Sequence, residues 1–377
     1  MSEPTRSNPD RPSSPHLLLH ILLALIVAQG VEAYTQQWQQ GLRVTGLTDQ
    51  VSWGFYLGQF TFLVGVAASA VILVIPAWWL GWKTIRPYTA LGECLSITAV
   101  LMALTFTLVD LGQPLRLWHA LPLLGTLNFP QSIMAWDLMV LLTYLLINSL
   151  LVTLQLRHPH ASHDRLLPWF VLATLLGLSI HTVTAFLYAG LPARPLWNSA
   201  LLAPRFIASA FASGAALLLL LTGLSQRQAT DSPQTPPTIT RLLVGVMTLS
   251  LLLQLFFLAS EWFVHTTRHP GNTHDPWLAS ALSAQTLCAL TLLIPSWRRH
   301  PVTLRLTALT IFLAILTEKG FGVVASGFQP TPLGEWTAYA PTIVELRIGL
   351  AIWAAGAGLF IGLRALLLRT QRIEPQE

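Results

Sequence analysis

Apolar runs of about 18 or more residues recur along almost the whole of this chain of 377 residues. A helix of that length crosses the roughly 30 Å of a bilayer's hydrocarbon core. The runs lack the alternation of a transmembrane β-barrel, so helices are expected to satisfy the backbone. Because 53% of the residues are hydrophobic and only 10% are charged, one soluble core could not bury them. The sequence predicts an all-α, polytopic membrane protein.

About ten transmembrane helices are expected, at residues 17–34, 53–80, 88–109, 133–156, 166–188, 205–224, 242–264, 277–294, 304–319 and 343–367. The even number places both termini on one side of the membrane. A Pro- and Ser-rich disordered tail is predicted for residues 1–16, a linker for 225–240 and a second tail for 370–377. Two membrane regions, 17–224 and 241–369, remain.

Segments 62–67 and 211–216, in the second and sixth spans, share a short pattern of Phe, Gly and Ala. An internal duplication would explain the match, since membrane transport folds often contain repeats. Small residues that let two helices pack closely would explain it equally well.

Charge in the loops predicts the orientation. Fourteen of the 21 Lys and Arg residues lie on the side of the termini, and seven lie on the other side. By the positive-inside bias the termini are cytoplasmic, and the loops after the first, third, fifth, seventh and ninth spans face outward. This topology accounts for the formal net charge of +5, so no nucleic-acid partner is expected.

The content of histidine and cysteine limits the redox groups that the chain can hold. His181 is the only histidine in the middle of a span, whereas a transmembrane haem needs histidines facing each other from two helices. Cys94 and Cys288 are the only cysteines and form no ligand motif, which excludes iron–sulfur clusters and covalently attached haem. No metal site is expected. In redox chemistry, electrons would therefore have to pass through a bound small molecule and a partner subunit.

Ionisable residues inside spans are candidate functional groups, because each costs a few kcal/mol in hydrocarbon unless it is paired or reaches water. Asp110 ends the third span and Asp137 opens the fourth, so both are expected near the outer surface. The segment between them can also be explained as an interfacial loop with aromatic anchors and a snorkelling Arg116. His181 lies a little outward of the midplane, either as a hydrogen-bonding core residue or as a group that exchanges protons with a quinol.

Another set of ionisable residues lies near the ends of later spans: Arg205, Glu261, Glu318, Lys319, Glu345 and Arg347. Neighbours in a helix point apart, so Glu318 and Lys319 cannot pair with each other. Glu345 and Arg347 are the expected partners, in either a structural charge network or a functional site. Glu93, near the cytoplasmic end of the third span, is either a point where protons enter or a packed, ion-paired acid.

Several segments together carry a resemblance to a known family: residues 51–57, 110–119, 128–137, 180–195, 318–322 and 327–334. Over about residues 35–365 the chain is similar to the NrfD/PsrC family of membrane quinone-interacting subunits. The ten-span form and the motifs of the fifth and ninth spans most resemble the DsrP-type members, which belong to DsrMKJOP complexes of sulfur metabolism.

That resemblance implies two antiparallel four-helix bundles plus additional helices, the first within residues 17–224 and the second within 241–369. It implies no cofactor of the chain's own, with menaquinone or ubiquinone as an exchangeable substrate in a pocket near the outer face of the first bundle. The pocket candidates are Asp110, Arg116, His119, Trp136, Asp137 and His181. The resemblance assigns a role to the acids Glu261, Glu318 and Glu345 of the second bundle less directly. Family members often have Arg where this chain has Gln113, so an ion pair from that position is not expected.

The resemblance also implies partners: a periplasmic iron–sulfur protein, a multihaem cytochrome c, a haem b membrane subunit and a cytoplasmic iron–sulfur subunit. The leading hypothesis is a quinone-interacting subunit of a respiratory or sulfur-metabolism electron-transfer complex in the bacterial inner membrane, not catalytic alone. Two alternatives stay open. A secondary transporter of an ion or anion would use the same buried charges, and a structural anchor would only hold redox partners.

Overall fold

The computed structural model describes residues 14–120, 125, 128–158, 162–191, 194, 197–226, 237–268, 276–324 and 339–373. Within these ranges every regular element is helical, and nine helices are long and apolar enough to cross a membrane. The remaining expected span, 277–294, corresponds to α9 (Pro276–Leu293). Its apolar part, Ala279–Leu293, is shorter than the nine helices that are long enough to cross a membrane. The prediction of an all-α polytopic membrane protein is confirmed.

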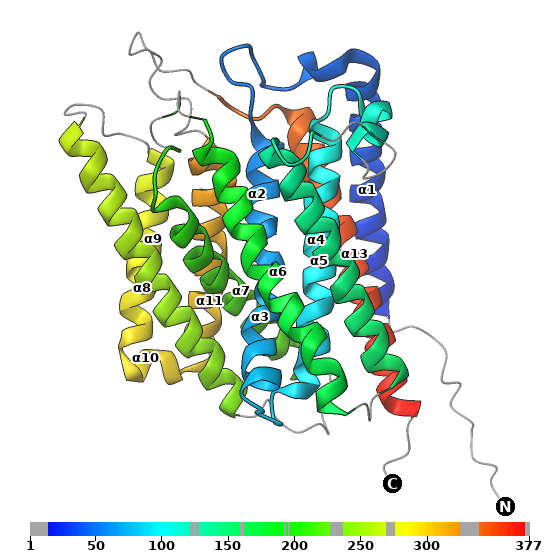
Figure 1. Cartoon of the computed structure of the whole chain (residues 1–377), viewed down its shortest axis with the longest axis vertical. Coiled ribbons are helices and arrows are strands. Elements are labelled where there is room, and N and C mark those ends of the chain that lie inside the picture. Colours follow the sequence, from blue (N-terminus) through cyan, green and yellow to red (C-terminus); the bar gives the residue numbers. More distant parts are fainter. Residues whose placement is uncertain are drawn as a thin grey trace, which may run out of the picture.

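The remaining long helices are α1 (Ser14–Gln40), α2 (Phe55–Ala67), α4 (Thr89–Asp110), α5 (Ile133–Arg157), α6 (His163–Ala189), α7 (Leu202–Gln226), α8 (Pro237–Arg268), α11 (Pro301–Thr317) and α13 (Ile343–Ile373). Shorter elements extend or join them: η1 (Gly41–Val44), α3 (Ser69–Val74), η2 (Ile75–Trp79), η3 (Arg86–Tyr88), η4 (Pro114–Ala120), α10 (Pro295–Arg299) and η5 (Glu318–Gly322). We call the end of the molecule where α4 ends and α5 begins the upper end, as drawn in Figure 1.

Two antiparallel groups of four helices stand side by side (Figure 1). The first consists of α2 with α3, α4, α5 and α6, and the second of α7, α8, α9 and α11. Helices α1 and α13 pair with each other, and α13 also packs against α4. The division into two groups does not coincide with the linker expected at residues 225–240. Helix α7 precedes the linker but packs against α8 and α11. Helix α13 follows the linker but pairs with α1. Residues 1–13, 227–236 and 374–377, within the expected tails and linker, lie outside the described residues.

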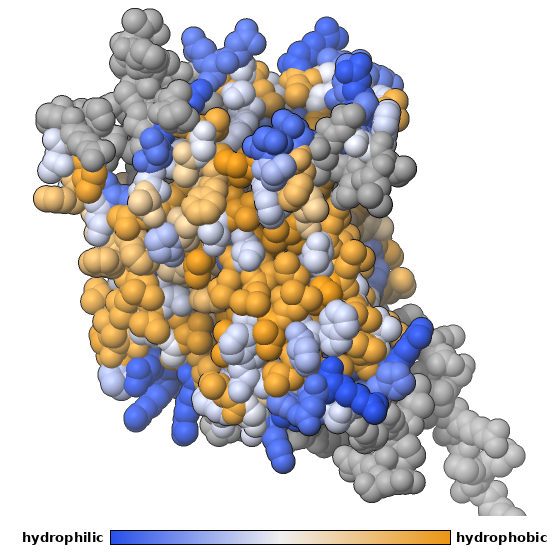
Figure 2. Space-filling model, viewed as in Figure 1, coloured by the Kyte–Doolittle hydropathy of each residue, from blue (hydrophilic) through white to orange (hydrophobic). Residues whose placement is uncertain are grey.

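Figure 2 shows a broad apolar band across the middle of the face in view, with hydrophilic side chains at both ends. Leu249 and Phe256 of α8 are more than half exposed, as expected for side chains in contact with lipid. Helix α1 begins, and α13 ends, at the lower end (Figure 1). Helix α2 is different, because its residues are buried between the other helices of the first group and those of the second.

Glycines allow α2 to approach its neighbours closely. A Cβ atom on Gly58 would lie 1.9 Å from the carbonyl oxygen of Gly320 in η5. A Cβ on Gly214 of α7 would lie 3.2 Å from Cα of Ser69, and one on Gly65 would lie 3.7 Å from Cα of Ala210. Gly65 and Gly214 are the matched glycines of segments 62–67 and 211–216, so packing of α7 against α2 and α3 accounts for both small residues.

The variant Gly58→Ala is expected to destabilise the protein, because the added methyl group would overlap the backbone of η5. Overpacking of this kind costs about 1–3 kcal/mol, so the Tm of the purified chain in detergent should fall. Gly245→Ala in α8 is the matched control, since nothing lies within 4 Å of its Cβ position. Alanine favours helix more than glycine does, so this control should keep or raise the Tm. Equal Tm changes in the two variants would contradict the close approach of α2 and η5.

Candidate functional site

Asp137 and the last turns of α6 form a buried polar group at the upper end of the first bundle. Ser132 caps α5 by accepting a hydrogen bond from the amide of Ala135, which places Asp137 in the second turn of the helix. The Asp137 side chain is buried, and its Oδ1 accepts a hydrogen bond from the Thr184 hydroxyl at 2.7 Å. His181 lies one turn before Thr184 on the same face of α6. The fifth and fourth spans thus bring an imidazole and a carboxylate to one region, as the sequence indicated.

His181 is almost completely buried, with 1% of its surface exposed. Among the described residues neither of its ring nitrogens has a hydrogen-bond partner. Buried polar atoms are nearly always paired, so an unpaired imidazole indicates a water molecule, a ligand or a proton-transfer role. Lys319 of η5 is close enough to interact with it electrostatically.

Tyr188 connects this group to the end of α4. Its hydroxyl lies 2.5 Å from that of Thr61 in α2, and both Asp110 and Asp137 are close enough to interact with it electrostatically. Oδ1 of Asp110 is buried and has no hydrogen-bond partner among the described residues. The upper end of the first bundle therefore holds two carboxylates, an imidazole and a phenol within one buried region.

Three of the expected pocket residues are on the surface instead. The Arg116 and His119 side chains are exposed in η4, where the His119 ring stacks on Trp118 with centroids 3.8 Å apart. The Trp136 side chain is 42% exposed, and its indole N–H donates to the carbonyl oxygen of Pro130 at 3.0 Å. The structure thus does not bring these three side chains into the buried group, and they suit the polar surface of a membrane better.

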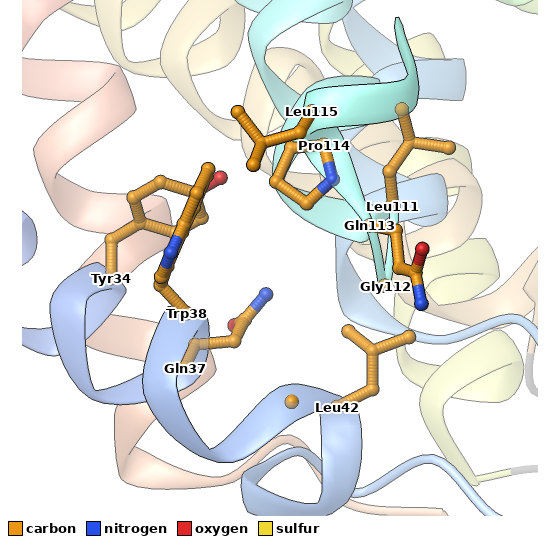
Figure 3. Close-up of a pocket in the computed structure, with 10 residues that line it drawn as sticks. Tyr34, Gln37, Trp38, Leu42, Leu111, Gly112, Gln113, Pro114 and Leu115 are labelled. Atoms are coloured by element: carbon orange, nitrogen blue, oxygen red, sulfur yellow. The ribbon is translucent and has the colours of Figure 1, made fainter.

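An open cavity of about 310 Å³ lies beside Asp110, between the upper end of α1 and the segment that follows α4 (Figure 3). It is lined by Tyr34, Gln37, Trp38, Gly41, Leu42, Leu111, Gly112, Gln113, Pro114 and Leu115. Gln37 is buried at its edge, where its Oε1 accepts from the Tyr56 hydroxyl at 2.7 Å and its Nε2 donates to the Val109 carbonyl at 2.6 Å. The sequence interpretation missed this cavity.

A second buried polar group lies in the second bundle and joins α7, α8, α9 and η5. Arg205 forms an ion pair with Glu261, and its Nε lies 3.8 Å from Oε1 of Glu318. Gln254 and Gln285 point their amide groups at Oε2 of Glu318, at 2.7 and 3.4 Å. The expectation that Arg205, Glu261 and Glu318 would form a polar network is consistent with this geometry, although the two glutamines were not anticipated.

Lys319 does not join that ion-pair network. Its ammonium group donates to the carbonyl oxygen of Phe206 at 3.1 Å and lies 4.3 Å from the centre of the Phe206 ring. Glu318 and Lys319 point in different directions, as expected for neighbours in a helical turn. The prediction that Glu345 and Arg347 pair with Glu318 and Lys319 was wrong, because Glu345 and Arg347 bind other residues.

Glu345 caps the start of α13. Its Oε2 accepts from the amides of Gly46 and Thr342, both at 2.8 Å, and its Oε1 accepts from the Tyr339 hydroxyl at 2.7 Å. Burial, followed by the hydrogen bond to Glu345, raises the pKa of Tyr339, so that hydroxyl remains a donor. Arg347 pairs with Glu32 of α1 at 2.7 Å on a more exposed face. Both residues therefore hold α13 to α1 and to the segment that follows η1, rather than completing the second-bundle network.

Glu93 is fully buried in the lower half of α4. Its Oε2 accepts from the amide of Gln155 in α5, whereas its Oε1 has no hydrogen-bond partner among the described residues. Thr89 in turn donates to Oε1 of Gln155 at 3.0 Å. A packed, ion-paired acid is one of the two interpretations of this position from the sequence. In the structure the partner of the Glu93 carboxyl group is the neutral amide of Gln155.

The fold and this site define a multi-pass membrane protein with buried titratable side chains at one end of a four-helix bundle. Within the described residues, no three His, Cys, Asp or Glu side chains are grouped so that they could hold a metal ion. The family model described as "Polysulphide reductase, NrfD" matches residues 43–293. The chain belongs to this family, which confirms the resemblance to NrfD proteins.

Three curated relatives are similar to the chain. A putative membrane subunit of a dimethyl sulfoxide reductase from Halobacterium salinarum is 27% identical, and the match covers 94% of this chain and 91% of the relative. A selenate reductase subunit from Mesobacillus selenatarsenatis is 23% identical, with 93% and 92% covered. An Hdr-like menaquinol oxidoreductase integral membrane subunit from Archaeoglobus fulgidus is 26% identical, with 54% and 49% covered.

Proposed function

We propose that the chain is the quinone-interacting membrane subunit of a multi-subunit redox complex, where it exchanges electrons between the membrane quinone pool and an iron–sulfur partner. The observation that carries this proposal is the buried group of Asp137, Thr184 and His181, with Asp110 at the same end of the bundle. Membership of the NrfD family supports it, as do two relatives named as subunits of reductases and one named as a menaquinol oxidoreductase subunit.

The chemistry of a quinol requires such groups. Oxidation of one quinol to a quinone releases two electrons and two protons. His181 and the two carboxylates are titratable groups of the kind that take up protons in catalysis. The electrons go to a partner subunit, because the histidines and cysteines of the sequence lack the patterns of a haem or an iron–sulfur cluster.

We further propose that the upper end faces the periplasm of a bacterial inner membrane, with both termini in the cytoplasm. The excess of Lys and Arg in the loops at the lower end supports this orientation. The iron–sulfur partner would then cover the upper end, and Glu93 would be reached by protons from the cytoplasmic side. The motifs at 180–195 and 318–322 favour a sulfur-metabolism complex with a multihaem cytochrome c, a haem b subunit and a cytoplasmic iron–sulfur subunit.

The direct test uses the purified full-length chain in nanodiscs. Menadione and decylubiquinone, as naphthoquinone and benzoquinone probes, are expected to bind saturably by equilibrium dialysis, with protein-free nanodiscs as the blank. The visible spectrum of the same sample should show no chromophore. A haem spectrum from the isolated chain, or the absence of saturable binding of either quinone, would overturn the proposal.

A further inference from the structure

We infer that the cavity between α1 and residues 111–115 receives the quinone ring, and that α1 supplies its outer wall. This inference rests on the proposed function and assigns to it a particular place in the fold. In Figure 3, Tyr34 and Trp38 lie on one side of the cavity, and residues 111–113 lie on the other. Pro114 and Leu115 lie above it, and Gln37 and Leu42 lie below.

The composition of the walls suits a flat ring that carries polar oxygens and an apolar tail. The aromatic rings of Tyr34 and Trp38 can stack on a quinone, and the leucines and Pro114 exclude water from its edges. Gln113 adds an amide group that can donate to a carbonyl oxygen. A volume of about 310 Å³ is at the small end of ligand sites, so it holds a ring but not a long isoprenoid tail.

The position of the cavity suits a molecule that arrives from the bilayer. Most of the surface of α1 is exposed, and Trp38, near the upper end of this helix, is 48% exposed. A quinone tail can therefore remain in lipid while the ring enters between α1 and η4. The cavity is open, which an exchangeable substrate requires.

Buried titratable side chains lie next to residues that line the cavity. Residues 111–115 follow Asp110 directly, and its Oδ1 is buried without a hydrogen-bond partner among the described residues. On the other wall, Gln37 holds the Tyr56 hydroxyl at 2.7 Å, and Tyr56 is close enough to Asp110 to interact with it electrostatically. A ring in this cavity would thus lie beside a carboxylate that leads, through Tyr188, toward Asp137 and His181.

Half of this cavity comes from a part of the chain that precedes the family match. The match begins at residue 43, whereas Tyr34, Gln37, Trp38, Gly41 and Leu42 belong to α1 and η1. Helix α1 is fixed in place by the hydrogen bond from Gln37 to Val109 and by its packing against α13. We therefore assign α1 a direct part in binding the substrate.

The test fills the cavity without straining the backbone. Gly112 has an ordinary backbone conformation, and no heavy atom lies closer than 3.5 Å to its Cβ position, where the nearest is a Leu42 methyl group. In the full-length chain in nanodiscs, Gly112→Leu is expected to weaken menadione binding by about tenfold or more, because the new side chain occupies the space of the ring. Gly362→Leu is the matched control, since nothing lies within 4 Å of its Cβ position in α13, and it should bind like the parent.

Trp38→Ala tests the aromatic wall by removal rather than by filling. Loss of one stacking contact should weaken binding by about threefold to tenfold, and Trp38→Phe should restore most of it. Trp82→Ala, which removes a similarly exposed tryptophan at the lower end, should have no effect. If the parent binds menadione and both Gly112→Leu and Trp38→Ala bind it equally well, the site in α1 is refuted and the proposed function stands. If the parent binds no quinone, the proposed function itself fails.

Discussion

Asp137→Asn, in the assembled complex, is expected to slow electron transfer from quinol to the partner subunit by about 10- to 100-fold, as for loss of a general base. Asparagine has nearly the same size and can still accept the hydrogen bond from Thr184, so the bundle should remain folded. It cannot take up a proton, and a quinol cannot lose its electrons rapidly unless its protons leave too. The measurement is the steady-state rate of quinol oxidation with an artificial electron acceptor, compared with the Tm of the same preparation.

His181→Gln should have a similar effect, because neither nitrogen of His181 has a structural partner to lose among the described residues. Thr184→Val provides the control: it removes the hydrogen bond to Asp137 but leaves the carboxylate, so a decrease of about threefold or less is expected. Unchanged rates in both Asp137→Asn and His181→Gln would favour a structural anchor over a subunit that exchanges protons with quinol.

The convergence of Asp110, Asp137 and His181 could be predicted because it depends mainly on connectivity. A span that runs outward ends at Asp110, the next begins near Asp137, and the following one places His181 past its midpoint. In an antiparallel bundle these three positions must share one end, whatever the rotation of each helix. The sequence therefore contained enough information to locate the group, although not the hydrogen bond from Thr184 to Asp137 or the position of Tyr188.

The partners of Glu318 and Lys319 could not be predicted in the same way, because they depend on which helices are neighbours and how each is rotated. Helix α13 follows η5 in the chain but packs mainly against α1 and α4, and the side chains at its start contact Gly46 and Glu32 instead of Lys319. The role of Glu345 did leave a local signal: Thr342 and Glu345 have the spacing of a capping box at the start of a helix. That pattern would have assigned Glu345 to its own helix end.

The cavity beside α1 had a partial signal. Tyr34, Gln37, Trp38 and Gly41 recur at the spacing of one helical face, which indicates a face unlike the lipid-exposed remainder of α1. The fold determines which residues lie opposite that face. Residues 111–115 follow α4, so they reach α1 only when α1 and α4 come together at the upper end. A sequence pattern identifies such a face, but only tertiary packing supplies the other wall.

Arg205→Met is expected to cause the largest loss of stability of any single substitution in the second bundle. The guanidinium group pairs with Glu261 and lies near Glu318, and all three side chains are largely buried. Methionine fills similar space but leaves two acids without a cation, and removing one partner of a buried pair typically costs about 3–5 kcal/mol. The yield of folded chain and its Tm in detergent should both fall.

Two comparisons make this result specific to the buried charge. Arg347→Met removes the more exposed pair with Glu32, for which a loss of at most about 1 kcal/mol is expected. Adding Glu261→Gln to Arg205→Met should restore part of the lost Tm, because one of the two unpaired acids is then neutral while its hydrogen bond from Ser199 can persist. If Arg205→Met lowers the Tm no more than Arg347→Met does, the network in the second bundle is not what holds α7, α8 and η5 together, and its charges are then free to serve a transported ion or proton instead.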